Sequence, residues 1–177
     1  MAEALTSLIQ KKRATILSKW FDSTVQAYAA DTAVFLKNQK DPFANPVGSS
    51  TRKGIETLMD QLLGGMAADA ITAGLDPIMR IRAVQSLSPA RATAFIFALK
   101  QILRDMFRKE LQEADMARQF FDLEERIDRV ALEGFDIYMG CRERVLDLKA
   151  NEMRNRTYRA FKRAGLVSEG PDKETNE

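Results

Sequence analysis

The 177-residue chain is 45% hydrophobic and 29% charged, which excludes an intrinsically disordered protein and fits one domain. Its formal net charge is only +2, so total charge does not indicate nucleic-acid binding. The longest strongly apolar stretch, residues 94–99, is shorter than the roughly 18 residues that span a bilayer. Lys11, Lys12 and Arg13 interrupt the first apolar positions, which argues against a signal peptide. Because Cys141 is the only cysteine, we expect no internal disulfide and a cytoplasmic protein.

The sequence predicts helices throughout, because it has no Asn-Gly or Asp-Gly hairpin signal and no long apolar–polar alternation. Apolar residues at three-to-four spacing predict a first amphipathic helix that ends near Tyr28. They include Leu5, Ile9, Ile16, Trp20 and Val25. Asp31 is expected to cap a short second helix. The run NQKDPFANPVGSS, residues 38–50, indicates an ordered loop, after which a helix is expected to begin at Ser49 or Ser50.

Glycine and proline mark the boundaries expected in the middle of the chain. The helix that contains Ile55 and Leu62 is expected to break at Gly64, and a short helix is expected to close at Gly74. The pairs Asp76-Pro77 and Ser88-Pro89 each place a capping residue before proline, so both predict a helix start. The second of these helices is expected to be central and largely buried.

A very long helix is predicted after a turn near Ala114. No proline follows until residue 171, and a helix from about Met116 to Ala164 would be roughly 70 Å long. A compact domain of this size has a radius of gyration of about 16 Å, so we expect the helix to bend, project or pair with another chain. The polar residues 168–177 are expected to form a disordered tail after a helical domain of residues 1–167.

A narrow apolar seam is predicted along this helix, with two alternative roles. Its members recur at spacings of three and four residues: Tyr138, Cys141, Val145 and Leu148. This pattern is typical of a coiled-coil seam and would suit a homodimer. It lasts barely two heptads, however, and a stripe that faces the protein's own core has the same spacing.

Catalytic and metal chemistry is poorly supported by the composition. The chain has no histidine, which removes the usual general base, haem ligand and transition-metal ligand. No glycine-rich phosphate-binding loop occurs. Carboxylates that gather before and within the long helix are expected to form solvated faces, paired with Arg118, Arg126 and Arg129. They are Glu110, Glu113, Asp115, Asp122, Glu124, Glu125 and Asp128. Paired carboxylates in acid–base catalysis are the alternative, but we expect no enzyme, metal site or cofactor.

Two further features each have a structural and a functional interpretation. Cys141 is expected to be a buried, inert thiol, with redox sensing as the alternative. A set of apolar side chains belongs either to the core or to a small-molecule cavity between helices. It comprises Trp20, Phe35, Phe95, Phe97 and Met106.

The end of the long helix is basic, with six cations and one acid between residues 149 and 163. The candidate partner-binding residues are Lys149, Arg154, Arg156, Arg159, Lys162 and Arg163. They suit an acidic protein surface or nucleic-acid phosphates, or they are a solvated helix end.

Three stretches together resemble a known family. They are KDPFANPVGSS at 40–50, RIRAVQSLSPARATAFIFALK at 80–100 and FDIYMGCRERVLDLKANEMRNRTYRAFKRAGLV at 135–167. They resemble the RsbRD-type N-terminal domain, the sensory module of certain RsbT co-antagonist proteins. In that family a STAS output domain typically follows the sensory domain. We expect no STAS domain here. The resemblance therefore implies a free-standing sensory module that is dimeric and loosely globin-like in its packing. The lack of histidine argues against haem.

Taken together, these features predict a single all-α helical-bundle domain with a long C-terminal helix. We expect a non-enzymatic bacterial sensory or regulatory protein that forms homodimers and meets an unidentified protein partner through that helix. A nucleic-acid-binding regulator and a small-molecule-binding sensor are the alternatives. No membrane association is expected.

Overall fold

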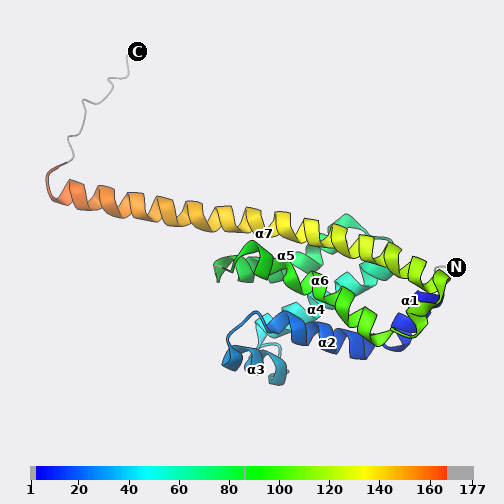
Figure 1. Cartoon of the computed structure of the whole chain (residues 1–177). Helices are drawn as coiled ribbons and strands as arrows, with labels where there is room; N and C mark the ends of the chain where they lie inside the picture. The colour runs from blue at the N-terminus through cyan, green and yellow to red at the C-terminus, as the bar shows by residue number, and fades with distance from the viewer. Residues whose placement is uncertain (1–2, 86, 167–177) are drawn as a thin grey trace, which may run out of the picture. The chain divides into compact units, whose positions relative to one another are not determined.

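The computed structural model describes residues 3–85 and 87–166 (Figure 1). Within these ranges the chain forms seven α-helices and one short 3-10 helix, and no strand is present. The helices are α1 (Glu3–Lys11), α2 (Arg13–Val25), α3 (Ala30–Asn38), α4 (Pro46–Leu63), α5 (Ala68–Val84), α6 (Pro89–Met106) and α7 (Ala114–Arg163). The all-α fold with a long final helix is thereby confirmed. The predicted tail, residues 168–177, lies outside the described residues.

The first predicted helix is in fact two. The chain breaks at Lys12, whose backbone leaves the helical region at φ −107° and ψ 13°, and α2 begins at Arg13. The apolar positions read from the sequence are nevertheless buried on both sides of the break, with Ile9, Ile16 and Trp20 each 0% exposed. The three-to-four spacing therefore identified the buried face correctly but not the break within it.

The loop before α4 is ordered by one buried side chain. The Nδ2 of Asn45 donates to the carbonyls of Leu36 and Gln39 at 3.0 and 2.8 Å, and its Oδ1 accepts from the Gly48 N–H at 2.8 Å. Asn45 is thus the N-cap of α4, which begins at Pro46. The prediction of a start at Ser49 or Ser50 was wrong, because Asn45-Pro46 provides an earlier cap and first-turn proline.

Helices α4 and α5 pack against each other through two glycines. A Cβ on Gly54 would lie 2.5 Å from the Gly74 carbonyl oxygen, so the two backbones approach too closely for any side chain. Gly74 lies inside α5, so the prediction that it closes a helix was wrong. Pro77 also lies inside α5, so the predicted helix start at Asp76-Pro77 was wrong. An internal proline forfeits one hydrogen bond of the helix, and here it lies within a tightly packed helix pair.

The later helix boundaries agree with the sequence. Helix α4 ends at Leu63, directly before Gly64-Gly65. Helix α6 begins at Pro89, and the Oγ of Ser88 accepts a hydrogen bond from the Arg91 N–H as its N-cap. As expected of a central helix, α6 buries Phe95, Ile96, Leu99 and Leu103 in the core.

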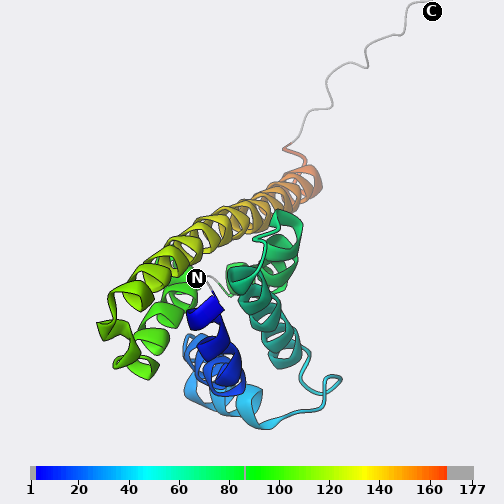
Figure 2. The same cartoon turned by 90° about the vertical axis from the view of Figure 1, so that its right-hand side faces the viewer.

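The chain divides into two compact units, Met1–Arg142 and Glu143–Glu177. The first contains α1 to α6 and the first part of α7, whose colours run from blue to yellow in Figure 2. Nine residues of α7 are buried, from Met116 to Cys141, and all belong to this unit. In the second unit, by contrast, every described residue is exposed except Val145, which is half-buried.

Candidate docking face on the C-terminal helix

The basic residues singled out from the sequence are all exposed on α7 of the second unit. They are Lys149, Arg154, Arg156, Arg159, Lys162 and Arg163. At 100° per residue, Lys149, Arg156 and Arg163 are spaced by seven and therefore follow one line along the helix. Arg154 lies on the other side of the apolar positions described next. The basic segment is thus spread around the helix and is not gathered on one side.

An apolar stripe, which the sequence analysis missed, runs between these cations. It comprises Leu146, Ala150, Met153 and Phe161, with the polar Thr157 in line between the last two, so that the five residues are spaced by four, three, four and four. Leu146, Met153 and Phe161 are 49%, 70% and 50% exposed. Shallow surface hollows beside Met153 are lined by Lys149, Glu152 and Arg156 on one flank, and by Arg154 and Phe161 on the other. We call these five stripe residues, with the flanking cations Lys149, Arg154, Arg156 and Arg163, the docking face; Arg159 and Lys162 lie on the opposite side of the helix.

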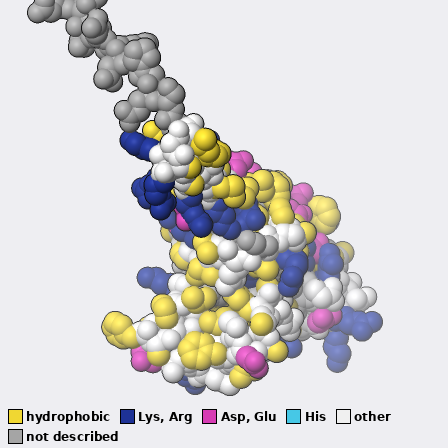
Figure 3. Space-filling model, turned by 90° about the vertical axis from the view of Figure 1, so that its left-hand side faces the viewer, with side chains coloured by type: hydrophobic (Ala, Val, Ile, Leu, Met, Phe, Trp, Pro, Cys, Tyr) yellow, Lys and Arg dark blue, Asp and Glu magenta, His cyan; other side chains and the backbone are white. Residues whose placement is uncertain are grey.

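Space-filling representation shows the mixed character of this region. Figure 3 shows dark blue Lys and Arg side chains beside yellow apolar ones around the end of the described chain. An isolated exposed apolar residue is ordinary on a protein surface, but a row of them at helical spacing is characteristic of a helix that meets another surface. The signal was present in the sequence, but the cations interleaved with the stripe obscured it.

The predicted seam is divided between the two units. Tyr138 and Cys141 are buried in the first unit at 1% and 6% exposure, and the Tyr138 hydroxyl donates to the Leu87 carbonyl. Val145 is half-buried and Leu148 is 70% exposed in the second unit. The first two members therefore serve the core of their own unit. The four residues do not act together as one surface.

Two acidic residues of α7 form ion pairs with the neighbouring helix α6. Glu124 pairs with Arg104 at 2.5 Å, and Asp128 pairs with Lys100 at 2.6 Å, both partners being on α6. Arg126 instead donates through Nη1 to the carbonyls of Leu62 and Gly64 at the end of α4. In the described part of the chain, no group of three or more acidic or cysteine side chains is placed to hold a metal ion.

The residues proposed from the sequence to line a cavity do not converge on one. Trp20 and Phe95 are buried and stacked, with ring centroids 6.5 Å apart, and the Trp20 Nε1 donates to the Phe95 carbonyl at 2.8 Å. Phe35 and Phe97 are 49% and 46% exposed. Met106 is half-buried. Phe95 instead lines a groove together with Arg82 and Arg91.

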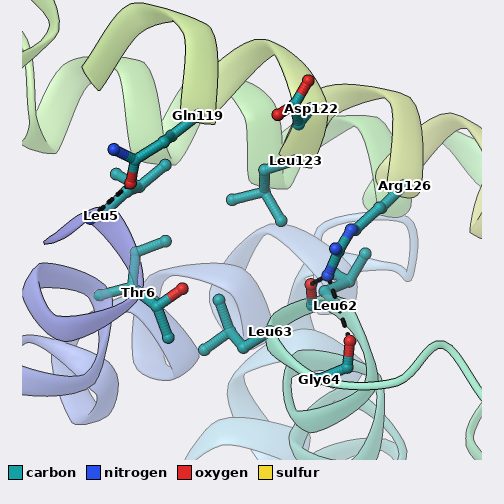
Figure 4. Close-up of a pocket in the computed structure, with 10 residues that line it drawn as sticks. Leu5, Thr6, Leu62, Leu63, Gly64, Gln119, Asp122, Leu123 and Arg126 are labelled. Carbon is teal, nitrogen blue, oxygen red and sulfur yellow. Dashed lines mark hydrogen bonds between the residues drawn. The ribbon is translucent and has the colours of Figure 1, made fainter. Parts of the chain in front are cut away.

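A small cavity lies between α1, α4 and α7 of the first unit (Figure 4). The Leu5 N–H donates to the Gln119 Oε1 at 3.1 Å on one side, and Arg126 caps the end of α4 on the other. Its volume of about 160 Å³ is below the several hundred cubic ångströms of typical ligand sites. Gln119 and Arg126 bind main-chain groups at the ends of helices, which indicates a structural role for these two side chains.

Comparison with known proteins identifies the domain type. The family model described as the RsbT co-antagonist protein RsbRD N-terminal domain matches residues 15–153, well over half of the chain. No curated protein and no solved structure matched the chain. The globin-like packing implied by the resemblance therefore stays a prediction. Across the described residues, no helix is both long and apolar enough to cross a membrane.

Proposed function

The chain belongs to the RsbT co-antagonist protein RsbRD N-terminal domain family, and we propose that it is a non-enzymatic bacterial regulatory module that recognises an acidic protein partner. The observation that carries the proposal is the docking face of α7, where exposed apolar residues alternate with cations. Membership of a family of sensory domains supports the regulatory role. The proposed site of action is the cytoplasm.

The chemistry of the docking face favours one kind of partner. Leu146, Met153 and Phe161 present apolar area that an amphipathic helix can cover, as in helix-in-groove recognition. The flanking line of Lys149, Arg156 and Arg163 then requires negative charge on the partner's edges. We therefore infer a partner helix with an apolar ridge and acidic flanks.

Two other occupants fit this face less well. A second copy of the same helix would bring the basic flanks together, and like charges across an interface oppose association. Nucleic acid would satisfy the cations, but phosphate contacts make no use of the apolar stripe between them. The exposed Met153 and Phe161 side chains therefore favour protein over nucleic acid.

The proposal is tested with a synthetic amphipathic peptide of about 20 residues that has leucines on one face and glutamates beside them. The full chain should bind it, and Met153→Asp or Arg156→Glu should weaken binding by about tenfold, as loss of a central contact does. Phe43→Asp is the matched control, because Phe43 is 96% exposed but lies in the loop before α4. Binding is measured by fluorescence anisotropy.

Two results would contradict this proposal. Equal binding of a peptide whose glutamates are replaced by lysines would show that charge complementarity plays no part. Steeply salt-dependent binding of duplex DNA, together with no binding of the acidic peptide, would instead establish the nucleic-acid interpretation.

We also propose that the chain forms homodimers, through a face of α7 in the first unit. Phe121, Leu132 and Phe135 share one side of the helix and are 63%, 68% and 42% exposed. Glu125 and Asp128 lie on the same side of the helix, and Asp128 pairs with Lys100 of α6 in the same chain. The exposed apolar side chains are the feature that supports self-association.

Dimerisation is measured by light scattering on the full chain, where a dimer has twice the 20.0 kDa mass of one chain. Leu132→Glu should shift the protein to monomer, because it buries a charge in the apolar contact. Leu148→Glu is the matched control and should leave the dimer intact. A monomeric wild-type protein at high concentration, or a monomer caused only by Leu148→Glu, would contradict this interface.

A further inference from the structure

Arg82 on α5 is a buried cation that main-chain carbonyls hold in place. The residue is 0% exposed. Its Nη1 donates to the Ala92 carbonyl at 2.6 Å and its Nη2 to the Thr24 carbonyl at 2.7 Å, so it links α5 to α6 and α2. The guanidinium also lies over the Phe95 ring, 4.5 Å from its centroid. Its Nε is buried without a hydrogen-bond partner.

The charge of Arg82 is only partly compensated. Among the described residues, no carboxylate forms an ion pair with it. Burial lowers the pKa of its guanidinium, and the nearby phenol of Tyr28 opposes that change. The carbonyl of Thr24 belongs to the last turn of α2, where the helix dipole supplies about half a negative charge. Buried charges in proteins are ordinarily paired, so a fraction of one positive charge stays unmatched here.

An open groove passes beside this cation, between the end of α2 and the first turns of α6. Its volume is about 310 Å³, at the lower end of the range for small-molecule sites. The lining includes Arg82 and a second arginine, Arg91, but no aspartate or glutamate. Ser23 and Gln26 add polar groups, while Phe95 and two alanines, Ala94 and Ala98, form an apolar wall.

We propose that this groove binds the carboxylate group of a small organic acid whose apolar body lies against Phe95 and the two alanines. The carboxylate would accept from the exposed guanidinium of Arg91, as guanidinium groups commonly bind carboxylates, while the buried charge of Arg82 beneath the groove attracts it without a direct contact. One negative charge suffices, because Arg91 is exposed and its own charge is solvated. The ligand class is therefore a monocarboxylate and not a multiply charged phosphate.

The alternative is that Arg82 serves only to fasten three helices together through main-chain carbonyls. That role accounts for its terminal nitrogens, but it leaves the buried positive charge without a carboxylate partner among the described residues. It also leaves unexplained a groove lined by two cations without a single acid. The inference does not depend on the docking face, since it concerns residues of α2, α5 and α6 alone.

The test measures the dissociation constant of benzoate for the full chain by isothermal titration calorimetry. Benzamide, an uncharged molecule of similar shape, is measured in the same way. Benzoate should bind at least about tenfold more tightly than benzamide, because a charge-assisted hydrogen bond is lost in the amide. Arg91→Gln should weaken benzoate binding several-fold. Ala94→Glu, which supplies a tethered carboxylate at the groove, should abolish it.

Arg108→Gln is the matched control, because Arg108 is an exposed arginine outside the groove and its loss should change nothing. All variants alter exposed positions and should keep the circular dichroism spectrum of the wild type. Equal binding of benzoate and benzamide would overturn the proposal, as would benzoate binding that survives both Arg91→Gln and Ala94→Glu. Tight binding of inorganic phosphate without binding of benzoate would overturn the monocarboxylate assignment.

Discussion

Both parts of α7, before and after Arg142, carry apolar residues at helical spacing. Those of the first part are buried, whereas those of the second part are exposed. In the first unit, Phe120, Ile127 and Tyr138 are at most 6% exposed and belong to the core. In the second unit, Leu146 and Met153 are about half exposed or more. Apolar residues at helical spacing therefore identify a face that requires a partner. They do not reveal whether the partner is the same chain or another molecule.

The largest difference between the two units should appear when a large side chain is truncated in each. Trp20→Ala should lower the free energy of unfolding by about 3–5 kcal/mol, because it leaves a cavity and removes the hydrogen bond to Phe95. Met153→Ala should change it by less than about 0.5 kcal/mol. Urea denaturation followed by circular dichroism measures both. Equal losses would mean that Met153 is not a surface residue in solution.

A smaller effect is expected from added volume. Gly54→Ala would place a Cβ 2.5 Å from the Gly74 carbonyl oxygen and should cost about 1–3 kcal/mol of stability through overpacking. Gly65→Ala is the matched control, because a Cβ there meets nothing within 4 Å. The melting temperature of each variant checks the pair. A stable Gly54→Ala protein would show that α4 and α5 can separate at little cost.

The smallest effect concerns a single polar side chain. Asn45→Ala removes the cap of α4 and two hydrogen bonds to carbonyls at the end of α3, and should cost about 1–2 kcal/mol. Asn155→Ala, in the exposed part of α7, should leave the unfolding free energy within about 0.5 kcal/mol. Denaturant titration again provides the measurement. Similar values for the two asparagines would contradict the ordered loop.

The fold was largely predictable because local signals and packing agree over most of the chain. Ser88-Pro89 and Gly64-Gly65 mark helix ends both in the sequence and in the structure. Gly74 and Pro77 carry the same kind of signal but lie inside α5. There the close contact with Gly54 requires a glycine in mid-helix, and no property of the sequence near Gly74 reveals that distant contact.

The candidate sites were only partly predictable. The cations of α7 stand out in the sequence, whereas the stripe of Leu146, Met153 and Phe161 becomes evident only once their exposure is known. The sequence does not predict that Arg82 is buried, because an arginine on an amphipathic helix is ordinarily exposed. Its burial depends on three helices meeting around it, which is a tertiary property.

The contact between Trp20 and the Phe95 carbonyl also has a spectroscopic consequence. Trp20 is the only tryptophan of the chain, so all indole emission comes from one buried ring. Its Nε1–H is fixed on the carbonyl of Phe95, whose side chain lines the groove beside Arg82. The wavelength and intensity of that emission thus report on the groove's surroundings without any attached dye, and a titration in a cuvette can follow what enters it.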